Sequence, residues 1–195
     1  MPILYLHGFN SAPQSRKAQL LQAYLARRGL GDEFVCPALP HRPALAIALL
    51  EHELEHHRGA AVTLVGSSLG GYYATYLAER HGLRAVLVNP AVTPQRDLSQ
   101  YLGPQRNLYT GDEYVLTAEH IAEWRRLEVP VTDPARYLLL VETGDETLDY
   151  REAVRKYAGA RQVVVAGGDH TLRSFPDHLP LIIEFAGLRA RPAGA

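Results

Sequence analysis

The residues of this chain best suited to chemistry form the motif GSSLG at positions 66–70, directly after the apolar run at positions 60–65. A GxSxG motif between a strand and a helix presents a serine on a sharp turn, where backbone N–H groups and the positive end of the helix dipole favour negative charge. Ser68 is the central residue of the motif and is therefore the candidate nucleophile. A tight turn without any chemistry would leave the same short pattern, so the surrounding sequence must decide.

A serine nucleophile requires a base to accept its proton and a carboxylate to orient that base. The apolar run at residues 137–142 leads to Asp145, and the run at residues 162–166 leads to His170. Both residues thus follow predicted strands, as Ser68 does. The chain order serine, acid, histidine is one of the known orders of serine triads. We therefore expect Asp145 as the acid and His170 as the base.

Three other aspartates compete with Asp145 for the role of the acid. Asp112 lies in a second copy of the sequence TGDE, but no apolar strand precedes it. Asp149 stands where the next helix should begin and is typical of an N-cap. Asp169 adjoins His170 in sequence, and adjacent side chains that leave a strand point in opposite directions. These positions favour Asp145.

The pair His7-Gly8 follows the apolar run at residues 2–6. A loop at the end of an early strand is where a serine hydrolase of this kind places one half of its oxyanion hole. The negative oxygen of a tetrahedral intermediate needs two hydrogen-bond donors. We expect the backbone N–H of Leu69, the residue after the nucleophile, and the backbone N–H of Phe9. The ring of His7 is expected to brace its loop by hydrogen bonding and not to transfer protons.

The composition is typical of one globular enzyme domain. The chain has 195 residues, of which 47% are hydrophobic, and this length suits one core. We assign residues 1–188 to a single domain and residues 189–195 to a flexible tail. The 20 basic and 21 acidic residues leave a net charge of -1, which predicts no nucleic-acid or membrane-surface partner. No apolar run approaches the roughly 20 residues that span a bilayer.

The cysteine usage and the start of the chain both favour a cytoplasmic location. Cys36 is the single cysteine, which excludes an intrachain disulfide. Pro37 follows it, and no motif like the GxSxG turn around Ser68 surrounds it. We therefore expect a buried structural thiol and not a nucleophile. Residues 2–6 already predict the first strand, so no signal peptide is expected.

Short apolar runs and helical patterns alternate along the chain. Strands are predicted near residues 2–6, 33–36, 61–65, 84–88, 137–142 and 161–166, and helices near residues 14–28, 43–57, 69–80, 149–158 and 178–187. Continuous apolar strands that alternate with helices indicate a parallel sheet covered on both faces. The predicted fold class is a compact, doubly wound α/β fold with about six mostly parallel strands.

Residues 91–135 interrupt this alternation. They contain four prolines and one predicted helix near residues 117–128, and they are far longer than the usual connection of two to six residues. Such an insertion at the edge that carries the candidate triad is expected to act as a lid.

The insertion also holds four large aromatic residues: Tyr101, Tyr109, Tyr114 and Trp124. They can line an acyl pocket or simply pack the insertion onto the body. Asn10, Tyr114 and Trp124 are the candidate substrate contacts. If the aromatic residues only pack, the acyl site would lie in the loop at residues 9–14.

The sequence HELEH at residues 52–56 matches the zinc-protease motif HExxH. A zinc site would require both imidazoles to face an enclosed site with a third ligand. On a helix, His52 and His56 fall opposite the apolar stripe that must face the sheet. We therefore expect both histidines to face solvent, and we expect no metal or other cofactor.

Four stretches occur in a familiar order: LYLHGFNSAP, LVGSSLGGYYATYLAERHGLRAVLVNPA, VETGDETLDYREAVRKYAG and GGDHTLRSF. Together they resemble the YqiA-like esterases, small members of the α/β-hydrolase superfamily. The resemblance covers nearly the whole chain up to Leu188 and is weakest across residues 95–130. It implies a cytoplasmic serine esterase that acts on acyl esters or acyl-CoA thioesters, and a spatial strand order of 2-1-3-4-5-6 among the six predicted strands. It also implies the nucleophile Ser68, the acid Asp145 and the base His170.

The function expected from these residues is acyl transfer to water through an acyl-enzyme, with a small-molecule ester or thioester as the substrate. An acyltransferase, a peptidase or a perhydrolase would use the same triad. The same fold also serves as a non-catalytic binding protein in which a triad member has been lost, and none is missing from this sequence.

Overall fold

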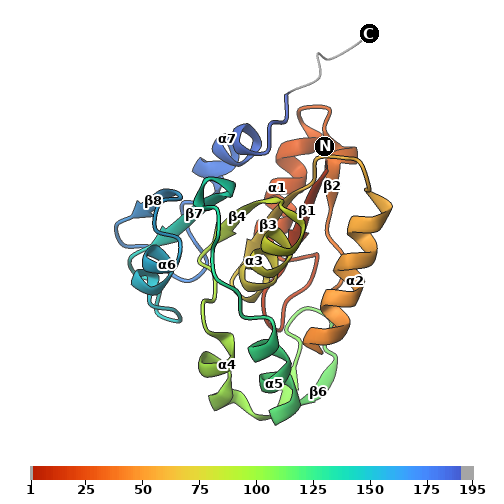
Figure 1. The fold of residues 1–195 in the computed structure, drawn as a ribbon, viewed down its shortest axis with the longest axis vertical. Helices are drawn as coiled ribbons and strands as arrows, with labels where there is room; N and C mark the ends of the chain where they lie inside the picture. The colour runs from red at the N-terminus through yellow and green to blue at the C-terminus, as the bar shows by residue number, and fades with distance from the viewer. Residues whose placement is uncertain (1, 190–195) are drawn as a thin grey trace.

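The structure is a computed structural model that describes residues 2–189. Within these residues, the main sheet has six parallel strands in the order β2-β1-β3-β4-β7-β8 (Figure 1). The strands are β1 Ile3–Leu6, β2 Phe34–Val35, β3 Thr63–Ser67, β4 Arg84–Val88, β7 Tyr137–Glu142 and β8 Arg161–Val165. This order confirms the one that the family resemblance implies. The parallel sheet with flanking helices confirms the predicted α/β fold class.

Helices cover both faces of the sheet. Successive side chains of a strand point to opposite faces, so each central strand contributes to two core layers. On β1, Ile3 and Tyr5 belong to the core layer under α1 and α7, whereas Leu4 and Leu6 belong to the layer under α2, α3 and α6. These helices are α1 Arg16–Ala26, α2 Pro43–His56, α3 Leu69–His81, α6 Tyr150–Lys156 and α7 Phe175–Phe185. Burial on both faces explains why the strands read as continuous apolar runs.

The parallel arrangement brings the loops that follow β1, β3, β7 and β8 to one edge of the sheet. The pairing places Gly66 of β3 beside Leu6 of β1, and Glu142 of β7 beside Val165 of β8. Residues that follow these strand ends are therefore neighbours, although they are far apart in the sequence. All candidate site residues except those of the insertion follow one of these four strands.

The insertion between β4 and β7 gathers at the lower end of the view in Figure 1. Its elements are α4 Pro94–Asp97, η2 Ser99–Tyr101, β5 Gly103–Arg106, β6 Glu113–Leu116 and α5 Ala118–Arg126. Helix α5 confirms the helix predicted near residues 117–128. The antiparallel pair β5-β6 was not predicted, because its strands have only four residues each, β5 begins with Gly-Pro, and both lie largely at the surface.

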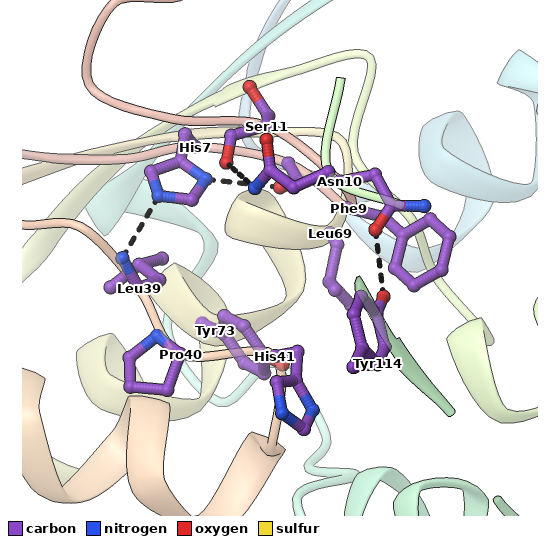
Figure 2. A pocket seen from close by; sticks show the side chains of 12 residues that line it. His7, Phe9, Asn10, Ser11, Leu39, Pro40, His41, Leu69, Tyr73 and Tyr114 are labelled. Carbon is purple, nitrogen blue, oxygen red and sulfur yellow. Dashed lines mark hydrogen bonds between the residues drawn. The ribbon is translucent and has the colours of Figure 1, made fainter. Parts of the chain in front are cut away.

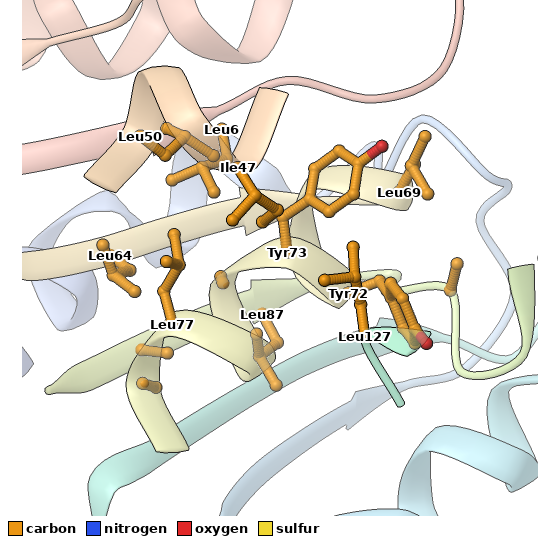
Figure 3. Close-up of a cluster of buried hydrophobic side chains, with 14 of the residues drawn as sticks. Leu6, Ile47, Leu50, Leu64, Leu69, Tyr72, Tyr73, Leu77, Leu87 and Leu127 are labelled. Atoms are coloured by element: carbon orange, nitrogen blue, oxygen red, sulfur yellow. The ribbon is translucent and has the colours of Figure 1, made fainter. Parts of the chain in front are cut away.

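Trp124 of α5 fixes the insertion to the body of the protein. Its side chain is fully buried, with 0% exposed. Its indole N–H donates to the Tyr73 hydroxyl at 2.8 Å, and the Tyr72 hydroxyl donates to the Trp124 carbonyl at 2.7 Å. Tyr72 and Tyr73 extend from α3 into the apolar cluster that also contains Leu127 (Figure 3). Of the two roles weighed for this tryptophan, the structure thus supports packing.

Asn10 joins the loop after β1 to the insertion. Its side-chain oxygen accepts from the Tyr114 hydroxyl at 2.8 Å, and its amide group donates to Gln105 Oε1 at 3.1 Å. Its backbone carbonyl also accepts from the Leu108 N–H at 3.3 Å. The loop that follows β1 and the β5-β6 hairpin are therefore held together as one wall above the sheet edge.

Two expectations from the sequence concern membrane-spanning helices and the C-terminal tail. No helix within residues 2–189 combines the length and apolar character needed to span a bilayer. The expected flexible tail at residues 189–195 lies, from residue 190 onward, outside the described residues. The assignment of residues 1–188 to one domain with a lid stays a prediction.

Candidate active site

Ser68 lies on the turn between β3 and α3 with φ 55° and ψ −122°. A residue with a side chain rarely adopts this conformation, which costs about 1–3 kcal/mol. The Ser68 N–H donates to the Val88 carbonyl at 3.0 Å, which fixes the turn to β4. A Cβ atom on Gly66 would overlap the Gly70 carbonyl, and one on Gly70 would overlap the Leu6 carbonyl. Close backbone packing therefore explains both glycines of the motif.

The structure brings the three residues of the expected triad into one chain of hydrogen bonds. His170 Nε2 lies 3.1 Å from Ser68 Oγ. His170 Nδ1 lies 2.8 Å and 3.0 Å from the two carboxylate oxygens of Asp145. When Nδ1 carries the proton and donates it to Asp145, Nε2 can accept the proton of the Ser68 hydroxyl. This geometry is suited to serine deprotonation.

The Asp145 carboxylate is itself held in place by the loop after β7. Its Oδ1 accepts from the backbone N–H groups of Thr147 and Leu148, each at 2.8 Å. Only 2% of the Asp145 side chain is exposed, compared with 23% for His170. The carboxylate is therefore fixed and shielded, whereas the imidazole can be reached from the solvent.

The three competing aspartates have other partners. Asp112 is exposed in the insertion. Asp149 is the N-cap of α6 and accepts from the Arg151 N–H at 3.0 Å, which confirms the predicted cap. Asp169 forms an ion pair of 2.6 Å with Arg173. Within the described residues, none of the three carboxylates contacts the imidazole of the triad.

The backbone of the loop after β1 lies directly beside the nucleophile. A Cβ atom built on Gly8 would come within 3.2 Å of Ser68 Cβ and 3.7 Å of Ser68 Oγ. Among residues 2–189, the N–H groups of Phe9 and Leu69 donate to no protein acceptor. Leu69 is the first residue of α3, where an N–H has no partner within the helix. Both donors are available to a ligand, and their role in an oxyanion hole stays a prediction.

His7 braces the loop after β1, as predicted. Its Nε2 accepts from the Leu39 N–H at 3.0 Å, and its Nδ1 donates to the Gly8 carbonyl at 3.1 Å (Figure 2). Burial lowers the pKa of the His7 imidazole. The neutral ring thus connects the segment before α2 to the loop beside the nucleophile.

Two cavities open onto Ser68 and His170. We call the first the insertion cavity; its volume is about 310 Å³. Its apolar wall consists of Phe9, Leu69, Ala91, Pro94, Leu98, Tyr101 and Leu148. Most of this wall belongs to the insertion, so the insertion shapes the space beside the nucleophile.

The second cavity, which we call the α1 cavity, has a volume of about 470 Å³. It also includes Ser68 and His170, together with Thr171. Its remaining walls include Tyr5, Ser15, Arg16, Lys17, Leu108 and Tyr109. In contrast to the insertion cavity, it places two basic side chains near the nucleophile.

The candidate substrate contacts lie in different places. Asn10 lines both cavities, Tyr101 lines the insertion cavity and Tyr109 lines the α1 cavity. Tyr114 lines a separate small pocket of about 40 Å³ (Figure 2). Trp124 reaches neither large cavity because it is fully buried. Tyr101 and Tyr109, and not Tyr114 or Trp124, are thus the insertion aromatics that line the two large cavities.

Sequence reasoning missed Glu142, the last residue of β7. Its buried carboxylate accepts from the N–H groups of Asp169, Arg173 and Ser174 at 2.8, 3.0 and 2.8 Å, and from the Ser174 hydroxyl at 2.7 Å. Burial opposes its ionisation, but these hydrogen bonds outweigh burial and lower the pKa of Glu142. Glu142 thereby anchors both sides of His170. A charged residue at the end of an apolar strand is the signal that could have identified it.

Asn89, which follows β4, also contacts the loop that contains His170. Its side-chain oxygen accepts from the Glu142 N–H at 3.1 Å. Its amide group donates to the carbonyls of Asp169 and His170 at 3.1 and 3.2 Å. Asn89 and Glu142 are therefore positioning residues for the imidazole.

Two further expectations concern residues away from the triad. His52 and His56 are exposed, as predicted. Residues 2–189 contain no group of three side chains arranged to hold a metal ion. Cys36 is partly buried against the core layer under α1 and α7, and burial raises the pKa of its thiol to about 12. A thiol with so high a pKa is a poor nucleophile at neutral pH.

Comparison with known proteins identifies the family. A family model described as "Uncharacterised protein family (UPF0227)" matches residues 2–187. The chain belongs to this family. A UPF0227 protein from Shewanella woodyi is 27% identical over 97 residues, which are 49% of this chain and 54% of that protein. The chain thus matches about half the length of this curated relative. The family match confirms the resemblance to the YqiA-like proteins.

Solved structures share the fold of this UPF0227 protein. A protein from Agrobacterium vitis S4 whose name describes it as a hydrolase has a TM-score of 0.75 at 19% identity, and the match covers 95% of this chain and 87% of that one. Alpha/beta hydrolase domain-containing protein 10 from mouse has a TM-score of 0.69 at 17% identity over 94% and 88% of the two chains. Est1E from Butyrivibrio proteoclasticus has a TM-score of 0.67 at 16% identity over 95% and 85%. The fold is that of the α/β hydrolases.

The contacts of Glu142 generate a prediction about stability and pH. Its pKa is lowered in the folded protein, so its contribution to the free energy of unfolding is fully present above the unfolded pKa of about 4.3. This contribution is lost as the pH falls from that value through the lower pKa of the folded protein. Glu142→Gln should lower the free energy of unfolding at pH 7 by about 1.5–3 kcal/mol, because an amide group replaces an acceptor of charged hydrogen bonds.

Urea unfolding at several pH values checks this prediction. The difference in stability between the natural protein and the Glu142→Gln variant should narrow below about pH 4.3. Glu113→Gln, which changes an exposed glutamate of β6, is the matched control and should have little effect at any pH. A difference between Glu142→Gln and the natural protein that stays constant down to pH 3 would contradict the assigned role.

Proposed function

We propose that this UPF0227 protein is a serine hydrolase that cleaves acyl esters or thioesters through an acyl-enzyme on Ser68. The observation that carries the proposal is the 3.1 Å contact between His170 Nε2 and Ser68 Oγ on a strained elbow. The fixed carboxylate of Asp145 on the other nitrogen of the imidazole supports it. Backbone strain of this kind is typical of functional sites, and its coincidence with the hydrogen bond to His170 supports a catalytic role for Ser68.

In the first half-reaction, Ser68 Oγ attacks the carbonyl carbon of the substrate while its proton passes to His170 Nε2. The carbonyl oxygen becomes negative and is stabilised by the N–H groups of Phe9 and Leu69. The bond from the carbonyl carbon to the leaving group then breaks, and the leaving alcohol or thiol takes the proton from Nε2. Asp145 accepts the Nδ1 hydrogen bond throughout and stabilises the imidazolium.

In the second half-reaction, water attacks the acyl group on Ser68. His170 Nε2 accepts a proton from the water, the bond between Ser68 Oγ and the acyl carbon breaks, and Oγ recovers the proton. A free carboxylic acid leaves. The protein supplies the nucleophile, the base and the oxyanion donors itself, so this route needs no metal or organic cofactor.

The cavities support a small-molecule substrate. A volume of about 310 Å³ for the insertion cavity lies at the lower end of the range for ligand pockets. Its apolar wall suits a short acyl chain or a comparable uncharged group. Est1E, which shares the fold, is an example in which ferulic acid is bound. An acyl-CoA thioester would undergo the same chemistry at Ser68. The balanced net charge of -1 supports the expectation that nucleic acid is not the partner.

The cytoplasm remains our proposed location for this activity. The single cysteine of the chain supports it, because the chain has no intrachain disulfide that would require an oxidising compartment.

The first test of the proposal compares adjacent serines. Ser68→Ala should lower kcat for a 4-nitrophenyl ester by about 10⁶-fold, as expected for the loss of a triad nucleophile. It should also abolish labelling by a fluorophosphonate probe. Ser67→Ala, the matched control, should keep substantial activity, because the Ser67 hydroxyl has no place in the triad. Labelling that maps to Ser67 or Cys36 would show that the nucleophile is assigned incorrectly.

The second test uses the two copies of the sequence TGDE. Asp145→Asn should lower kcat by about 10⁴-fold, because an amide group no longer selects the productive tautomer of His170. Asp112→Asn makes the same change in the exposed copy and should leave kcat nearly unchanged. Steady-state kinetics on the two variants measure this ranking, and the reverse ranking would refute Asp145 as the acid.

A further inference from the structure

The two cavities beside Ser68 differ in charge. The insertion cavity has an apolar wall, and apart from His170 its only ionisable side chains are Asp97 and Tyr101. The α1 cavity instead carries Arg16 and Lys17, both from the first turn of α1. A substrate whose reacting carbonyl lies at Ser68 extends in two directions from it. The protein therefore offers different surroundings to the two arms of one ester.

Within residues 2–189, one hydrogen bond holds the Lys17 side chain at this cavity. Its Nζ donates to the Thr171 carbonyl at 3.0 Å, and Thr171 directly follows His170. The side chain is partly buried. The chain has only two lysines, and the other, Lys156, lies in α6 against the ring of Tyr72. Lys17 therefore places a compact ammonium group beside the base, and two of its three donors have no acceptor among the described residues.

The carboxylates nearest to Lys17 are already occupied. Asp145 binds the imidazole, Asp169 binds Arg173, and Glu142 accepts four hydrogen bonds from the loop around the base. Within the described residues, no carboxylate forms an ion pair with Lys17. Burial lowers the pKa of its ammonium group to about 8, and attraction to these three carboxylates opposes the decrease. The group is therefore still largely protonated at neutral pH.

Arg16 adds a second positive charge at the rim of the same cavity. Its side chain is exposed and has no hydrogen-bond or ion-pair partner in residues 2–189. Lys17 is partly buried and forms no ion pair within residues 2–189, so an anionic group of a ligand can pair with it. The pair of cations thus gives the α1 cavity the chemistry of an anion subsite, within the same cavity as the nucleophile.

We propose that the α1 cavity binds an anionic group of the substrate, with Lys17 as its main contact, while the uncharged arm of the ester or thioester occupies the insertion cavity. This inference rests on the proposed function, because the anion is defined as part of the molecule that Ser68 attacks. The recognised chemistry is an oxyanion such as a carboxylate, on either the leaving-group arm or the acyl arm.

Lys17 also holds the Thr171 carbonyl, so the experiment must distinguish this structural role from binding of the substrate. If Lys17 only positions the loop around His170, its replacement lowers turnover of charged and neutral substrates by the same factor. If Lys17 binds the substrate, its replacement changes the ratio between the two. The informative readout is therefore a ratio of kcat/KM values and not a single rate.

Two matched pairs of esters measure that ratio. The first pair places the charge on the leaving group: 4-(butanoyloxy)benzoate and its neutral amide, 4-(butanoyloxy)benzamide. The second pair places the charge on the acyl arm: phenyl hydrogen adipate and its neutral amide, phenyl adipamate. Release of the phenol is followed for each. The natural protein should prefer the anion in at least one pair, and that pair shows which arm lies against Lys17.

The variants separate charge from structure. Lys17→Gln retains a donor for the Thr171 carbonyl but removes the charge, and it should reduce the anion preference by about tenfold or more, as expected for one charged hydrogen bond. Lys17→Arg should retain most of the preference. Lys156→Gln removes the other lysine, which lines neither cavity, and should leave the ratio unchanged. The preference of the natural protein should also decrease as salt is raised, which tests the inference even if a variant does not fold.

The outcomes also distinguish this inference from the proposed function. Hydrolysis of these esters that depends on Ser68, with no preference for the anion in either pair, would overturn the anion subsite alone. Equal loss for all four esters in Lys17→Gln would do the same. Hydrolysis of none of the four esters, or hydrolysis that persists in Ser68→Ala, would refute the proposed function itself.

Discussion

The close packing of backbone around the turn at Ser68 is the constraint on which the rest of the structure depends. Residues of β1, β3 and α3 approach so closely there that Gly66 and Gly70 have no room for a Cβ atom. This packing holds Ser68 in a conformation that residues with side chains rarely adopt. It also places the loop after β1, with the free N–H of Phe9, directly beside the serine. The same close backbone packing thus positions both the nucleophile and the N–H groups that we expect to form the oxyanion hole.

The remaining site follows from the parallel order of the strands, because the ends of β3, β7 and β8 meet at one edge. The loop with His170 is a short segment without regular structure, and it would be mobile without support. Glu142 and Asn89 supply that support from the ends of β7 and β4, through partly buried hydrogen bonds to the backbone at and around His170. Residues at the ends of β4 and β7 therefore help to position the base, together with Asp145 of the loop after β7.

Much of this arrangement could be predicted from the sequence, because the strands are buried on both faces and end in residues with distinctive chemistry. The apolar runs predicted the six strands, and the family resemblance implied their order. The residues that follow three of these strands predicted the triad Ser68, Asp145 and His170. The β5-β6 hairpin could not be predicted, since its short surface strands lack an apolar pattern. The burial of Trp124 could not be predicted, because the sequence does not distinguish a buried aromatic residue from one that lines a cavity. The position of the Lys17 charge in the α1 cavity depends on its hydrogen bond to Thr171, 154 positions later in the sequence. No local sequence pattern predicts a contact between residues so far apart.

The central claim, a covalent acyl-enzyme on Ser68, is tested most directly by stopping the reaction with acid during the first turnover of a butanoate ester and digesting the protein. The account predicts that mass spectrometry finds the butanoyl group on the peptide that contains Ser68, and that the early burst of leaving group matches the amount of this adduct. Turnover that proceeds with no adduct on Ser68, or with the acyl group on Cys36 or Ser67, would contradict the account.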